Sequence, residues 1–170
     1  MVSRKYMVAF LLVTLGGVCL HFLYDFFPAP ITALFGPVRE SIWEHVKLIY
    51  WPYLIFACLW TQDEPKGHWQ MHLSVLLIMC VFQTLCGWIY HIALGQDGLP
   101  FDLSLYVLTM GIGFGLSSFL KTRDTFRSSK LLPALAILLG ILIVVFTFFP
   151  PNLRLFADLS GVRTWATLPC

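Results

Sequence analysis

Residues 36–47 of this chain are Gly36-Pro37-Val38-Arg39-Glu40-Ser41-Ile42-Trp43-Glu44-His45-Val46-Lys47, and they lie between two long apolar segments. Six of these side chains are polar or ionisable, namely Arg39, Glu40, Ser41, Glu44, His45 and Lys47. A charge at the centre of a spanning helix costs about 2.5–3.5 kcal/mol, so charged groups beside hydrocarbon mark a functional site by default. The stretch therefore predicts where the functional site lies, and its neighbours predict what surrounds that site.

The composition predicts an integral membrane protein. Of the 170 residues, 58% are hydrophobic and 12% are charged, whereas roughly 25% are charged in soluble domains. The mean hydropathy is +0.79, and the net charge of +2 is too small to indicate a nucleic-acid partner. We expect one membrane domain over residues 1–170, with the lipid bilayer as its partner. Both a homo-oligomer and a separate membrane partner subunit stay open.

Apolar runs of about 20 residues predict an all-α bundle of about five transmembrane helices. The expected spans are 6–26, 41–60, 70–94, 101–120 and 131–149, with a C-terminal tail over 150–170. Gly36-Pro37 offers a helix start, because proline is tolerated at the first helical position. We therefore expect one helix from Pro37 to Trp60, amphipathic in its first half and apolar in its second.

The positive charges predict the orientation in the cell membrane, because cytoplasmic loops are enriched in Lys and Arg. A cytoplasmic N-terminus and an extracytoplasmic C-terminus place seven such residues inside: Arg4, Lys5, Lys66, Lys121, Arg123, Arg127 and Lys130. The outside then holds four: Arg39, Lys47, Arg154 and Arg163. This multi-pass arrangement puts residues 36–47 on the extracytoplasmic side.

Other segments supply polar partners at the same side of the membrane. His21 and Asp25 are four residues apart on the first span, so they face one direction. Tyr90 and His91 lie near the outer end of the third span, and Asp102 opens the fourth. We expect these side chains to meet residues 36–47 in one pocket.

Within the helix expected from Pro37, the polar residues form two stripes about 100° apart. Glu40, Glu44 and Lys47 share one stripe, and Ser41 and His45 share the other. No Glu and His in this stretch are three or four residues apart, so a metal site must be assembled between helices.

Histidine and carboxylate together suit zinc or non-haem iron, and they equally suit a proton relay or a general acid and base. The leading hypothesis is a polar pocket that holds a divalent metal such as zinc and serves a metal-dependent hydrolase. The candidate metal ligands are His21, Asp25, His45 and His91. The candidate catalytic carboxylates are Glu44 and Glu40, and the candidate substrate contacts are Ser41, Lys47, Arg39, Tyr90 and Asp102.

The same residues allow a purely structural explanation. Ser41 and Glu44 match a helix capping box, and Lys47 has a side chain long enough to reach the headgroups. A salt bridge of Glu44 with Lys47 or Arg39 would lock the helices of a transporter, assembly or accessory protein. The sequence shows no phosphate loop, nucleophile elbow or HExxH motif that would favour one enzyme class.

The stretch PVRESIWEHVKLIYWP at 37–52 resembles the signature of a family of small bacterial integral membrane proteins of unknown function, DUF6512. That signature is approximately PVNESVWEHLKLLFFP and follows a helix with a His and an acidic residue. The resemblance covers about residues 15–155, with Arg39 in place of the family's Asn and His91 where Thr or Tyr is usual. It implies a membrane helix bundle with no established activity. The matching positions are His21, Asp25, Glu40, Ser41, Trp43, Glu44, His45, Lys47 and Pro52.

Overall fold

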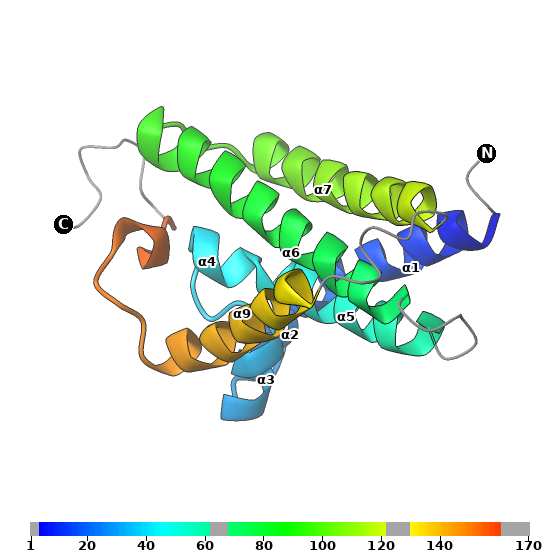
Figure 1. The fold of residues 1–170 in the computed structure, drawn as a ribbon. Coiled ribbons are helices and arrows are strands. Elements are labelled where there is room, and N and C mark those ends of the chain that lie inside the picture. Colours follow the sequence, from blue (N-terminus) through cyan, green and yellow to red (C-terminus); the bar gives the residue numbers. More distant parts are fainter. Residues whose placement is uncertain (1–3, 62–67, 122–129, 161–170) are drawn as a thin grey trace.

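The computed structural model describes residues 4–61, 68–121 and 130–160, which form a bundle of helices without a strand in these ranges (Figure 1). The long helices are α1 (Arg4–His21), α5 (Lys47–Trp60), α6 (His68–Gly87), α7 (Leu99–Leu120) and α9 (Leu131–Phe148). The short ones are α2 (Leu23–Phe26), α3 (Pro30–Phe35), α4 (Ile42–His45), the π-helix η2 (Trp88–Ala93) and the 3₁₀-helix η3 (Arg154–Phe156).

Three helical stretches in the described ranges are long and apolar enough to cross a membrane. They are His68–Ala93, which joins α6 and η2, Leu99–Leu120 and Leu131–Phe148. The apolar part of α1, Tyr6–His21, is shorter, and α5 has 14 residues. The expectation of an all-helical protein with membrane-type helices is therefore confirmed. Three of the five expected spans satisfy the length and composition of a crossing by themselves.

The single helix expected from Pro37 to Trp60 is wrong. Residues 36–41 are not helical, and α4 begins after Ser41, whose hydroxyl accepts the Glu44 N–H at 3.2 Å. An N-cap of this kind has extended backbone and marks the true helix start. Glu40 therefore lies outside the helix and shares no stripe with Glu44 and Lys47.

The first expected span is also interrupted. The helix α1 ends at His21, and α2 starts only after Phe22. Asp25 consequently belongs to a separate, four-residue helix, and the i, i+4 relation to His21 within one helix does not exist. Beyond α9, the chain folds back so that η3 contacts α4.

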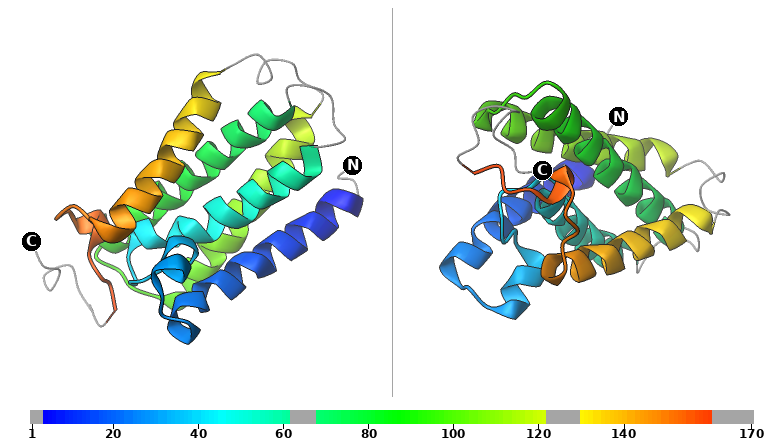
Figure 2. Two further views of the ribbon diagram at one scale, coloured as in Figure 1. Left: turned by 90° about the horizontal axis from the view of Figure 1, so that it is seen from below. Right: turned by 90° about the vertical axis from the view of Figure 1, so that its left-hand side faces the viewer.

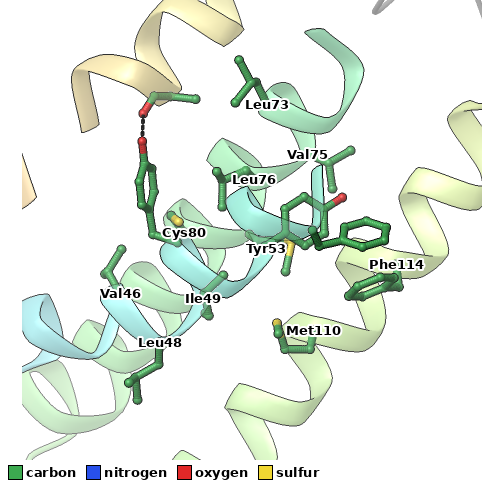
Figure 3. Close-up of a cluster of buried hydrophobic side chains, with 14 of the residues drawn as sticks. Val46, Leu48, Ile49, Tyr53, Leu73, Val75, Leu76, Cys80, Met110 and Phe114 are labelled. Atoms are coloured by element: carbon green, nitrogen blue, oxygen red, sulfur yellow. Dashed lines mark hydrogen bonds between the residues drawn. The ribbon is translucent and has the colours of Figure 1, made fainter. Parts of the chain in front are cut away.

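The helices α5 and α6 lie at the centre of the bundle. The helix α5 packs between α1 and α6, and α6 also contacts α7 and α9 (Figure 2). Figure 3 shows the buried side chains that fill the contact of α5, α6 and α7, among them Ile49, Tyr53, Leu76 and Met110. This core places the ends of α1, α4 and η2 on one side of the molecule.

Buried hydroxyl groups connect the helices across this core. Tyr106 Oη donates to the Thr14 carbonyl at 2.8 Å, Tyr50 Oη donates to the Ala136 carbonyl at 3.1 Å, and Thr109 Oγ1 donates to Gln83 Oε1 at 2.9 Å. In lipid, where helices gain little from apolar contact, such bonds and close packing hold a bundle together.

The contact of α1 with α5 depends on a glycine opposite a proline. Pro52 lies inside α5 and has no N–H, so the Leu48 carbonyl four residues earlier lacks its helical donor. Gly17 of α1 lies against this carbonyl, and a Cβ there would meet both the Leu48 oxygen and the Tyr106 hydroxyl. The absence of a side chain at position 17 lets the two backbones approach.

The substitution Gly17→Ala is expected to lower the free energy of unfolding by about 1–3 kcal/mol, because the added methyl overpacks a backbone contact. Gly111→Ala on α7 is the matched control, since a Cβ there meets nothing within 4 Å. Thermal unfolding in detergent measures both variants. Equal midpoints for the two would contradict the close α1–α5 contact.

Candidate functional site

Three side chains from separate segments converge at the end of α1. They are His21, the last residue of α1, Glu40 in the loop before α4, and His45, the last residue of α4. His45 Nε2 is 3.2 Å from Glu40 Oε2, and His21 Nε2 is 3.9 Å from Glu40 Oε1. One potential ligand atom from each residue lies within 4.8 Å of the other two. We call this group the His21–Glu40–His45 cluster.

The cluster is partly open to its surroundings. The exposed fractions of the side chains are 27% for His45, 30% for His21 and 47% for Glu40. A water molecule or a small ion therefore has access to the ligand atoms, while most of each imidazole is covered. The two rings lie next to each other, with centroids 5.4 Å apart.

The backbone orients the His45 ring. Its Nδ1 is 2.8 Å from the Ser41 carbonyl oxygen, and because a carbonyl only accepts, Nδ1 carries the hydrogen. In the neutral ring, Nε2 then presents its lone pair toward Glu40. Metal-binding histidines are held in this way, with the second ring nitrogen donating to a carbonyl or carboxylate. His21 Nδ1 is buried and has no hydrogen-bond partner in the described part of the chain, so no contact there fixes the tautomer of its ring.

The histidines also determine the acidity of Glu40. When His45 is protonated, its Nε2–H donates a hydrogen bond to Glu40, which lowers the pKa of the Glu40 carboxyl below its usual value; partial burial opposes this, and the positive charges of protonated His45 and His21 add to the lowering. Glu40 is therefore a carboxylate over the ordinary pH range, which is the form that binds a cation.

Glu44 and Lys47 form a separate, buried structure. The Lys47 side chain is fully buried, and its Nζ lies 2.6 Å from Glu44 Oε2, 2.8 Å from the Ala33 carbonyl and 3.3 Å from the Gly36 carbonyl. Glu44 Oε2 also accepts the Val38 N–H at 2.9 Å. All three hydrogens of the ammonium group thus have acceptors. We call this arrangement the Glu44–Lys47 lock, because it ties α3 and the following loop to α4 and α5.

The structure also locates the other residues that the sequence singled out. Ser41 caps α4, Arg39 is exposed, and Asp25 is exposed on α2, outside the cluster. Lys47 does not extend to the membrane surface. The structure brings together His21, Glu40 and His45 of the predicted set, and it separates them from Glu44.

His91 and Asp102 pair with each other near the cluster. His91 Nε2 is 2.8 Å from Asp102 Oδ1, and its Nδ1 is 3.1 Å from the Gln96 carbonyl. The charge of Asp102 also acts on His45. Tyr90 stacks on Phe101 with ring centroids 3.6 Å apart. His91 lies in the π-helix η2, a geometry that is frequent at functional sites.

The contact of Glu40 with His45 is the one that helical spacing missed. A separation of five residues is unfavourable within a helix, but Glu40 precedes the helix. The capping signal Ser41-x-x-Glu44 was the available clue, because an N-cap at Ser41 excludes Glu40 from α4. The Leu159 N–H, which donates to the Glu40 carbonyl at 2.7 Å, had no signal in the local sequence.

Comparison with known proteins places the chain in a family. The model of a family of unknown function, DUF6512, matches residues 2–163, so the chain belongs to that family, as its residues 37–52 implied. No curated protein and no solved structure matches the chain.

Removing the cation of the lock is expected to be costly. Lys47→Met leaves the Glu44 carboxylate buried without its counter-ion, which lowers stability by about 3–5 kcal/mol. The double variant Lys47→Met with Glu44→Gln removes both charges and keeps an acceptor for the Val38 N–H, so most of the loss is recovered. Unfolding in detergent measures both. A double variant as unstable as the single one would contradict the role of the unpaired charge.

The lowered pKa of Glu40 predicts a pH dependence in metal-free protein. While His45 is protonated, the carboxylate contributes its full stabilisation above about pH 4.3, the ordinary value for Glu, and loses it as the pH falls through the lower pKa of the folded state. Wild type is therefore expected to exceed Glu40→Gln in unfolding free energy at about pH 6, and this difference shrinks toward about pH 3. Unfolding curves in the presence of a chelator test this, and a difference independent of pH would refute it.

Proposed function

We propose that this member of the DUF6512 family is a membrane protein that binds one divalent cation, zinc in the first instance, at His21, Glu40 and His45. The observation that carries the proposal is the convergence of the three potential ligand atoms within 4.8 Å of one another. The tautomer of His45, held by the Ser41 carbonyl, supports it. Two histidines and one carboxylate are a donor set of catalytic zinc sites, where a water occupies the fourth position.

This donor set supports hydrolysis as the reaction class. A divalent cation held by the cluster lowers the pKa of its bound water toward about 7, which supplies a nucleophile at neutral pH. We assign Glu44 and Lys47 to holding the loop that carries Glu40, and we assign catalysis to the cluster itself. Arg39, Tyr90 and Asp102 are retained as candidate substrate contacts, with His91 as the partner of Asp102.

We also propose that the chain crosses the membrane five times. The helices α1 and α5 are then two further crossings beside the three helical stretches that qualify by length and composition. The Arg4 end of α1 and η3 lie at opposite ends of the bundle, which supports an odd number of crossings (Figure 1, Figure 2). The excess of Lys and Arg that the sequence places before the first expected span and in the loops after the second and fourth supports a cytoplasmic N-terminus. The cluster then faces the extracytoplasmic side.

A non-enzymatic role is the second candidate, and the Glu44–Lys47 lock is the observation that favours it. The lock is buried and its hydrogen bonds are satisfied, so it stabilises the bundle whether or not a reaction occurs. A transporter, assembly or accessory protein that works as a homo-oligomer or with a partner subunit would need such a lock. In that case the cluster is an ion pair of Glu40, in the loop before α4, with His21 of α1 and His45 of α4.

Metal analysis separates the two candidates. Protein purified in detergent, loaded with zinc and dialysed, is expected to retain about one zinc per chain. His21→Ala, Glu40→Gln and His45→Ala are each expected to lose it, because two remaining ligands bind weakly. Asp25→Asn is the matched control, since Asp25 is exposed and outside the cluster. A wild-type protein without retained zinc, nickel, manganese or iron would exclude the metal site.

A further inference from the structure

We infer that residues 150–160 form a strap that holds Glu40 in position as a ligand and thereby sets the affinity of the site for its cation. The inference rests on the proposed cation site. It assigns a role to a segment that follows the last long helix and contributes no ligand atom to the cluster.

The strap is bonded directly to the ligand residue. Leu159 N–H donates to the Glu40 carbonyl oxygen at 2.7 Å. Glu40 lies before α4, so no helical hydrogen bond holds its carbonyl. The bond from Leu159 therefore replaces the constraint that a helix would have supplied.

An aromatic anchor fixes the strap to the bundle. Phe156 is 8% exposed, and its ring lies 5.0 Å from Trp43 and 5.4 Å from Phe146, measured between centroids. Ring pairs at such distances contribute about 0.5–1.5 kcal/mol each beyond the area that they bury. Figure 1 shows η3 beside α4. Trp43, against which Phe156 packs, belongs to α4, which also carries the ligand His45.

Apolar contacts continue the anchor toward Leu159. Ile42 of α4 and Ile92 of η2 are buried together, and three side chains of the strap pack against them: Leu155, Ala157 and Leu159. The strap thus bridges the start of α4 and η2, at the end of the helical stretch His68–Ala93. This packing determines where the strap lies, and the hydrogen bond from Leu159 then fixes the position of the Glu40 backbone relative to the strap.

The loop that carries Glu40 is consequently held from two sides. The Glu44–Lys47 lock binds Val38 and Gly36 from the interior, and Leu159 binds Glu40 from the strap. Between them, the Glu40 carboxylate points to His45 and His21. Removing a group that orients a metal ligand typically lowers metal affinity about 10–100-fold. We therefore expect loss of the strap's contact to lower the affinity by this order.

The test replaces the donor and keeps the anchor. Leu159→Pro removes the N–H and leaves Phe156 in place, and Leu159→Ala keeps the N–H as the matched control. Zinc affinity of the full-length protein in detergent, measured by competition with a chromophoric chelator, is expected to fall about 10–100-fold in Leu159→Pro. Leu159→Ala is expected to bind zinc nearly as wild type does, because it keeps the N–H and the packing of Phe156, Leu155 and Ala157.

Two further readouts distinguish positioning from a general loss of structure. In the Glu40→Gln background, where the two histidines alone bind zinc weakly, Leu159→Pro is expected to change this residual zinc affinity no further, because coupled residues are not additive. With Co²⁺ in place of zinc, Leu159→Pro and Glu40→Gln are expected to change the visible spectrum in the same direction, as one carboxylate ligand is weakened or lost. If Leu159→Pro does not fold, Phe156→Leu, which loosens the anchor, is expected to give a smaller shift of the same sign.

The outcomes distinguish a failure of the proposed role of the strap from a failure of the proposed cation site. Wild-type affinity in Leu159→Pro, or an equal loss in the presence and absence of Glu40, overturns the strap while the cation site stands. A wild-type protein that binds neither Zn²⁺ nor Co²⁺ overturns both the proposed function and the strap.

Discussion

The buried ammonium group of Lys47 is the constraint on which the rest of the site depends. A fully buried charge requires a counter-ion and hydrogen-bond acceptors, because burying it without them costs about 3–5 kcal/mol. Lys47 finds them in Glu44 and in the Ala33 and Gly36 carbonyls. These contacts hold Gly36 and Val38 beside α4, which starts only after its N-cap Ser41, so a non-helical Glu40 can reach His45.

One short stretch of sequence therefore serves two purposes. The lock is buried and holds α3, the loop, α4 and α5 together, while the cluster of His21, Glu40 and His45 is half-open and presents ligand atoms. The division separates neighbouring residues, since Glu44 belongs to the lock and His45 to the cluster. Adjacent positions on a helix point about 100° apart, so one turn of α4 can supply both. The stabilising lock and the proposed cation site thus meet at a single helix of four residues.

Much of the helical structure and of the capped start of α4 could be predicted from local sequence patterns. Apolar runs predicted the long helices to within a few residues for α7, α9 and the stretch of α6 with η2, and Ser41-x-x-Glu44 contained the true start of α4. The contact of His45 with Glu40 was not accessible by counting along a helix, because the helix does not include Glu40. The exposure of Asp25 was missed for the same reason, since α1 ends at His21. The strap is joined to Glu40 by a backbone hydrogen bond, which no side chain encodes.

The sequence by itself determined the all-helical class of the protein, its family, the three long apolar helical stretches and the segment that carries the polar residues. Hydrophobicity, capping and the motif at 37–52 are local properties, so they can be recognised without a fold. Only the tertiary structure decided which polar residues work together. Lys47 and Glu44 pair because burial leaves them no water, and Glu40 joins His21 and His45 because the lock and the strap hold it outside the helix. Those constraints come from segments far apart in the chain.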